Sequence, residues 1–172
     1  AHNFNMTGGT FTDTTPSAED HSFTVTGSFS IPAAGAGTPF NRFGAEEEGY
    51  TMVRDVYDLQ AMRYDLTGNY QLVRDIDASG TAGWNSGAGF TPLGDGVSGF
   101  TGFLRGLGRS ISGLSMHQSR DYVGLFGRIG VGGKVHELAL ENVSAYGDGH
   151  RYIGGLAGKN EGEILKVSVN GA

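Results

Sequence analysis

The stretch ISGLSM at residues 111–116 recurs downstream in altered form, as VHELAL at 135–140 and as ILKVSV at 164–169. The step from the second copy to the third is longer than the step from the first to the second. A second phrase, YVGLFG at 122–127, recurs as YIGGLAG at 152–158. Recurrence at this spacing is typical of a chain that stacks copies of one small unit and buries a continuous core between them. The repeat therefore predicts a β-solenoid with long flat faces, which suit surface display.

Glycine dominates the composition, with 31 of 172 residues, whereas about 7% is usual. The chain has no Gly-X-Y period, which excludes collagen. Its ten Phe and seven Tyr argue against a disordered chain. Short apolar runs alternate with turns of Gly, Asn or Asp, and no long helical pattern appears. We expect the glycines at corners, where a positive φ or a close approach of backbones excludes a Cβ atom.

The charge pattern excludes several classes of partner. The net charge is −6, and the 12 Lys and Arg residues form no cluster, so no nucleic-acid partner is expected. No apolar run approaches the roughly 18–20 residues of a membrane span, so no membrane insertion is expected.

The absence of cysteine excludes disulfides and thiolate chemistry. The first residues lack the basic and apolar regions of a signal peptide, and we expect the chain to be a piece of a longer protein.

Two regions are predicted. Residues 1–45 form an N-terminal β segment, with period-2 alternation over 23–31, followed by a linker that contains Gly and Pro. Residues 46–172 form the solenoid. Within it, Asp55 is a candidate N-cap for a short helix near residues 55–63.

Two further expectations concern the solenoid itself. The apolar spacing of Val73, Ile76 and Ala78 matches that of ISGLSM and predicts a fourth copy of the phrase. The residues between copies, 79–99 and 141–151, are expected to be loops that carry the variation.

Several phrases in fixed order resemble the repeat region of filamentous-haemagglutinin-type adhesins. They are DIDA at 75–78, GFTPLG at 89–94, FTGF at 100–103 and VGLFG at 123–127. YIGGLAG at 152–158 resembles the GLUG motif of bacterial surface exoproteins. The resemblance covers roughly residues 50–172. It departs at one corner, where the usual Asp and His are replaced by Arg105 and Arg109, so the family's side-chain hydrogen bonding or ion binding is not carried over to this corner.

The resemblance implies a right-handed parallel β-helix, secreted and held on a Gram-negative cell surface. Such proteins attach to host cells, to other cells or to polysaccharide. The GLUG-like phrases supply the structural repeat glycines: Gly124, Gly127, Gly154, Gly155 and Gly158.

No catalytic constellation is recognisable in the sequence, because the five histidines are scattered and no nucleophile elbow or phosphate loop occurs. Asp75 and Asp77 could share one side of a strand and are the candidates for calcium binding or acid–base work. Alternatively, they simply flank a buried Ile76. Trp84 is the candidate for stacking on a sugar, the alternative being that it packs its own loop onto the core.

The sequence therefore favours a non-catalytic fragment of a surface adhesin whose partner is a host or bacterial receptor or a glycan. No cofactor is expected, with calcium as the alternative. A carbohydrate-active β-helix enzyme and a purely structural stalk are the rival hypotheses. Exposed strand edges also predict end-to-end self-association.

Overall fold

The computed structural model describes residues 46–47 and 49–171, and the expectations for residues 1–45 lie outside this range. The described chain is all-β, with parallel sheets and few helices, as the sequence predicts. The strands are β1 (Glu46–Glu47), β2 (Tyr50–Val53), β3 (Asn69–Leu72), β4 (Ile76–Asp77), β5 (Phe103–Ser112), β6 (Ser115–His117), β7 (Phe126–Ile129), β8 (Lys134–Tyr146), β9 (Ala157–Asn160), β10 (Glu163–Leu165) and β11 (Ser168–Gly171). The helical segments are α1 (Val56–Ala61) and the 3₁₀ segments η1 (Met62–Tyr64) and η2 (Ser79–Gly87).

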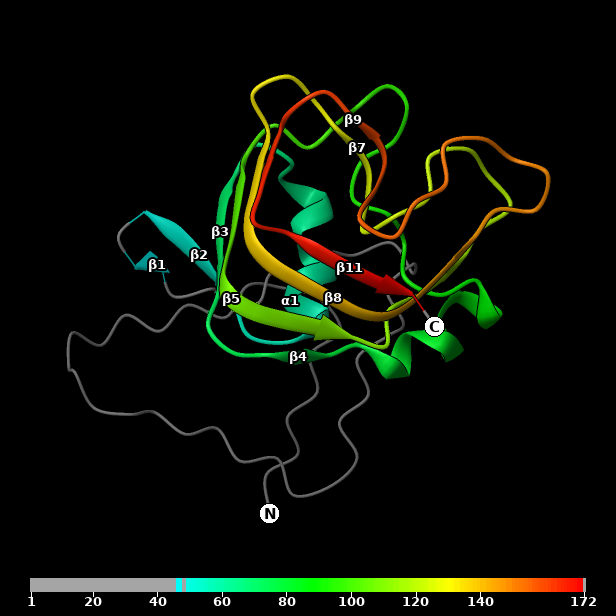
Figure 1. The fold of residues 1–172 in the computed structure, drawn as a ribbon, viewed down its shortest axis with the longest axis horizontal. Coiled ribbons are helices and arrows are strands. Elements are labelled where there is room, and N and C mark those ends of the chain that lie inside the picture. Colours follow the sequence, from blue (N-terminus) through cyan, green and yellow to red (C-terminus); the bar gives the residue numbers. More distant parts are fainter. Residues whose placement is uncertain (1–45, 48, 172) are drawn as a thin grey trace, which may run out of the picture. The chain divides into compact units, whose positions relative to one another are not determined.

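The repeated stretches lie side by side as parallel strands (Figure 1). One half of β8 pairs with β5 and β10, so that Leu104, Val135 and Ile164 are aligned. The other half pairs with β5 and β11. The predicted alignment of residue 135 with residue 164 is therefore confirmed.

The predicted alignment of residue 111 with residue 135 is wrong. Ile111 pairs with Leu140, and Leu140 pairs with Val169, so the two steps in this row are equal. The difference arises at a corner where the register shifts, because β5 has Gly106, Leu107 and Gly108 opposite the single residue Glu137 of β8. The longer corner of β5 shifts the apolar phrase along the strand.

The fourth copy is also displaced from its predicted position. Ile76, and not Val73, aligns with Ile111 through the pairing of β4 with β5. Two predicted loops contain ordered core structure as well. Phe90 and Leu93 of the first are fully buried, and β8 extends through Tyr146 into the second.

A second parallel pairing joins the two GLUG-like phrases. β7 pairs with β9, and an isolated parallel bridge joins Val123 to Ile153. Further parallel bridges join Leu93 to Phe126 and Phe100 to Ile129. The alignment of YVGLFG with YIGGLAG is therefore confirmed, and residues of 79–99 add a strand-like layer beside it.

The repeat glycines permit close contact between segments of the chain. A Cβ at Gly127 would collide with the carbonyl oxygen of Gly94, and one at Gly158 would lie 2.8 Å from the carbonyl oxygen of Gly127. A Cβ at Gly124 would lie 2.8 Å from the carbonyl oxygen of Gly154. A Cβ at Gly154 would meet the backbone of Ala157, and one at Gly155 would meet the side chain of Val169. None of the five glycines predicted from the repeat has a positive φ. Their role is close approach of backbone and side chains, one of the two uses expected for glycine.

The predicted short helix is confirmed as α1. Asp55 is its N-cap, and its side chain accepts hydrogen bonds from the backbone N–H groups of Tyr57 and Asp58. Val56 and Leu59 enter the core. No helix in the described part of the chain is long and apolar enough to cross a membrane.

Candidate binding surface

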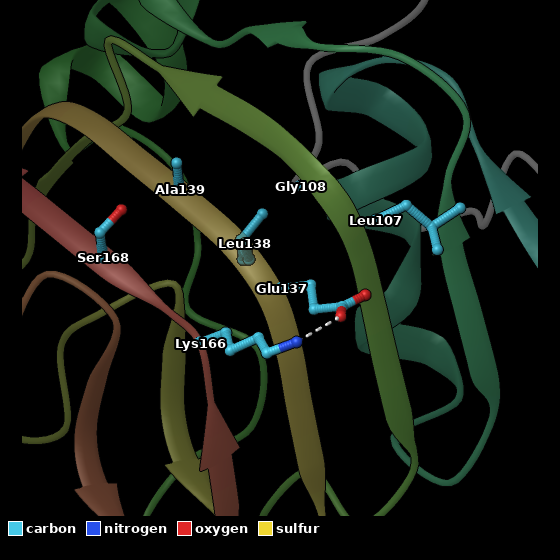
Figure 2. A pocket seen from close by; sticks show the side chains of 7 residues that line it. All are labelled: Leu107, Gly108, Glu137, Leu138, Ala139, Lys166 and Ser168. Atoms are coloured by element: carbon cyan, nitrogen blue, oxygen red, sulfur yellow. Dashed lines mark hydrogen bonds and ion pairs between the residues drawn. The ribbon is translucent and has the colours of Figure 1, made fainter.

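A shallow open groove of about 450 Å³ lies on the outer side of the sheet (Figure 2). It crosses β5, β8 and the segment that leads into β11. Its lining residues are Leu107, Gly108, Glu137, Leu138, Ala139, Lys166 and Ser168. The groove therefore combines aliphatic surface with a carboxylate, an ammonium group and a hydroxyl, all supplied by neighbouring layers.

Left-handed backbone conformations position the charged residues of this groove. Leu107, Glu137 and Lys166 have φ values of 57°, 56° and 53°. Such a conformation costs roughly 1–2 kcal/mol for a residue with a Cβ. Glu137 and Lys166 occupy equivalent positions, because the residues before them, His136 and Leu165, are paired in the register of β8 and β10.

The same corner therefore recurs in neighbouring parallel strands and presents two opposite charges side by side. The Nζ atom of Lys166 lies 3.4 Å from Oε1 of Glu137, and Figure 2 shows the two side chains reaching toward one another. The Lys166 side chain is 70% exposed. An exposed pair of this kind contributes little to stability, so both groups remain available to a ligand.

Other charged pairs join successive layers elsewhere. Nε of Arg128 donates to Oε2 of Glu161 at 2.6 Å, and NH1 of Arg128 donates to the carbonyl oxygen of Gly96 at 3.1 Å. Hydrogen bonds from Lys159 and then from Arg128 lower the pKa of Glu161. Arg128 thus links segments that are about one repeat apart on either side, and its role is structural.

In the part of the chain that the structure describes, five carboxyl groups have a pKa below the ordinary value, in each case chiefly because of hydrogen bonds donated to the carboxylate: Asp65, Asp77, Asp95, Asp121 and Glu161. A carboxyl group whose pKa is lowered in the folded state stabilises the fold at pH values above its ordinary pKa, which is 3.8 for Asp. This stabilisation is lost as the pH falls through the lowered pKa. We expect the melting temperature to be nearly constant from neutral pH down to about pH 5 and to fall below about pH 4. Thermal melts followed by circular dichroism across this range measure it.

Asp95 provides the matched variant for this prediction. Its Oδ1 accepts hydrogen bonds of 2.8 Å from the backbone N–H groups of both Val97 and Ser98. Asp95→Asn should be less stable at neutral pH and should lose less stability on acidification than the wild type. A wild-type melting temperature that does not change between about pH 5 and about pH 2 would contradict the assignment.

The two predicted metal or acid–base candidates are each engaged in a backbone hydrogen bond. Oδ1 of Asp75 accepts from the N–H of Ser110 at 2.8 Å, and Oδ1 of Asp77 accepts from the N–H of Ser79 at 2.9 Å. They flank Ile76, which is buried. Among residues 46–47 and 49–171, no group of three or more His, Asp or Glu residues is arranged to hold a metal ion.

The predicted stacking residue, Trp84, lies between two other aromatic rings. Its ring centroid is 5.2 Å from that of Tyr57 and 6.4 Å from that of Phe90, with interplanar angles of 30° and 23°. It packs against the core as a partly buried side chain. Trp84 therefore fastens the η2 segment to the core, and its position favours the packing alternative over sugar stacking.

Sequence reasoning missed Glu137 and Lys166 as candidate site residues, although both lie inside the quoted repeats. Aligning VHELAL with ILKVSV, so that Val135 lies opposite Ile164, also places Glu137 opposite Lys166. Their opposite charges at this shared position were the available signal.

Two proteins of known sequence are similar to this chain. Halomucin of Haloquadratum walsbyi is 39% identical over an alignment of 132 residues that covers 70% of this chain and 1% of that protein. A protein of Evansella cellulosilytica whose name describes a Gly-rich membrane protein is 35% identical over an alignment of 130 residues that covers 73% of this chain and 15% of that protein. The chain thus spans only a small part of either relative. No protein-family model and no solved structure matches it.

Proposed function

We propose that this chain is a non-catalytic module of a secreted or cell-surface protein and that it binds a glycan through the groove of Leu107, Glu137 and Lys166. The observation that carries the proposal is the recurrence of one outward-facing corner in successive layers, which places a carboxylate and an ammonium group beside each other on an open surface. Saccharides present many hydroxyl groups, and such a polar groove can donate to them and accept from them. An open groove also suits a long polymer, whereas small ligands are bound in concave sites that bury most of their surface.

The architecture that we propose is a right-handed parallel β-helix. Its support is a series of parallel pairings between residues at similar separations along the chain: Leu104 with Val135, Val135 with Ile164, Ile111 with Leu140, and Phe126 with Ala157. Similar separations in separate rows are expected when the chain completes one turn for each layer.

The adhesin relationship is part of the same proposal. Its support is the series of motif phrases in the sequence. The names of the two long relatives, one a halomucin and one described as a membrane protein, bear only on location. Both names are consistent with a location at the cell surface. Neither name mentions an adhesin.

The non-catalytic role is supported by the use of Asp75 and Asp77. Each carboxylate accepts a backbone hydrogen bond, at 2.8 Å for Asp75 and at 2.9 Å for Asp77, which suits a structural role. The enzyme hypothesis predicts cleavage of acidic polysaccharides, lost in Asp75→Asn or Asp77→Asn. Turnover with that dependence would overturn our proposal.

Binding is tested with immobilised acidic and neutral polysaccharides and with a glycan array. For each ligand that binds the wild type, we expect Lys166→Glu to raise the dissociation constant by at least about tenfold, which corresponds to about 1.4 kcal/mol. The matched control is Lys134→Glu, which changes charge equally at another exposed position outside the groove. Equal losses in both variants would indicate a general charge effect and would contradict a site in the groove, and so would the absence of binding to every glycan.

A further inference from the structure

Two arginines flank the part of β5 that lines the groove. Arg105 is two residues before Leu107, and Arg109 is two residues after it. Arg109 is also paired in register with Leu138, another residue that lines the groove (Figure 2). The groove therefore lies between two positions of the same strand that carry guanidinium groups.

Neither guanidinium group is neutralised within the described part of the chain, where Arg105 and Arg109 form no ion pair and donate no hydrogen bond. Nε of Arg109 is buried without a hydrogen-bond partner. Cζ of Arg105 lies 5.7 Å from the ring centroid of Tyr50. A guanidinium group has five N–H donors, and stacking on a ring leaves them free. Both arginines therefore have donors left for a ligand.

The charge around the groove differs in sign from that of the whole chain. The groove residues and the two flanking arginines carry three cationic side chains and one carboxylate. A further carboxylate, that of Glu163, lies 2.6 Å from Nε2 of His136 and so has a partner of its own. The whole chain has a net charge of −6. A local excess of positive charge on an acidic protein favours an anionic ligand at that place.

Aromatic rings lie beside Arg105 on the outer face of the sheet. Phe103 and Arg105 alternate with the fully buried Leu104, so both point outward. The ring centroid of Phe103 lies 5.9 Å from that of Tyr50 and 4.7 Å from that of His136. Such rings can pack against the apolar face of a sugar. A chain of acidic sugars matches this surface, because it offers apolar ring faces together with carboxylate groups.

We propose that the polymer bound in the groove is a carboxylated polysaccharide. Its carboxylate groups accept hydrogen bonds from Arg105 and Arg109, and its sugar rings pack against Phe103. Arginine forms two parallel N–H···O bonds with a carboxylate, so these contacts select acidic sugars over neutral ones. The inference rests on the proposed glycan binding and specifies the ligand of that site.

Equilibrium binding of the full chain to polygalacturonate and to its methyl ester tests the inference, because the two polymers share a backbone and only the first has free carboxylates. We expect the wild type to bind polygalacturonate at least about tenfold more tightly than the ester. Salt should reduce this difference. Arg105→Gln and Arg109→Gln should each raise the dissociation constant for polygalacturonate by at least about fivefold and that for the ester by less than about twofold.

The matched control is Arg63→Gln, which removes the same charge outside the groove. Cζ of Arg63 lies 5.2 Å from the ring centroid of Tyr64, so this arginine also stacks on a tyrosine. The control should bind polygalacturonate like the wild type. A circular dichroism melt verifies that each variant is folded, and the comparison of the two polymers needs no variant.

Three results would overturn the inference and leave glycan binding in place: equal affinity for polygalacturonate and its ester, unchanged affinity in both Arg105→Gln and Arg109→Gln, or binding of neutral glycans alone. Equally tight binding of polyglutamate, a polyanion without sugar rings, would also overturn it. The absence of binding to every glycan would overturn both the inference and the proposed function.

Discussion

Phe100→Ala is expected to lower the free energy of unfolding by about 3–5 kcal/mol. Phe100 is fully buried, its ring lies 4.8 Å from that of Phe126 and 6.3 Å from that of Tyr70, and its backbone bridges in parallel to Ile129. Removing the ring leaves a cavity between layers that are fixed by backbone hydrogen bonds, so the site cannot readily collapse. Urea denaturation followed by circular dichroism measures the change.

The control for this variant lies slightly earlier in the chain. Val97 is 89% exposed, and Val97→Ala should change the free energy of unfolding by no more than about 0.5 kcal/mol. If Phe100→Ala cost no more than this control, Phe100 would not occupy the core between the layers.

Gly127→Ala is expected to cost about 3 kcal/mol or more. A Cβ at this position would collide with the carbonyl oxygen of Gly94 and would lie 3.0 Å from that of Tyr122. Both neighbours are backbone atoms, which cannot move aside as the end of a flexible side chain can. The variant should therefore force neighbouring layers apart, which a lower urea midpoint and a lower melting temperature would report.

Gly83→Ala is the matched control for the glycine prediction. A Cβ at Gly83 would meet no atom within 4 Å, and the residue has no positive φ. Its effect on stability should stay within about 0.5 kcal/mol. Equal effects of the two alanine substitutions would show that Gly127 is not held between backbones.

The sequence was informative where apolar residues recur without insertions. Val135 and Ile164 could be aligned because both are followed by the same alternation of side chains. Ile111 could not be aligned correctly, because β5 has a longer corner than β8 at Leu107 and Gly108. ISGLSM and VHELAL have the same apolar spacing, although Ile111 and Val135 are not paired. The spacing alone therefore does not locate the insertion.

The candidate site was less predictable than the fold. Trp84 drew attention through its residue type, but whether its ring faces a ligand depends on contacts with Tyr57 and Phe90 that have no local sequence signal. Glu137 and Lys166 are neighbours because β8 and β10 pair in register up to His136 and Leu165, and each adopts a left-handed conformation at the corner that follows. Residues with a Cβ rarely adopt this conformation, and neither residue type predicts it.

Nuclear Overhauser contacts across the strands test most directly the claim that successive parts of the chain stack in parallel. In-register neighbours lie about 4.8 Å apart. We therefore expect amide-to-Hα contacts along the row of Ile76, Ile111, Leu140 and Val169. Contacts between the Hα atoms of β5 and β8 in an antiparallel register, or the absence of contacts between neighbours in this row, would contradict the account.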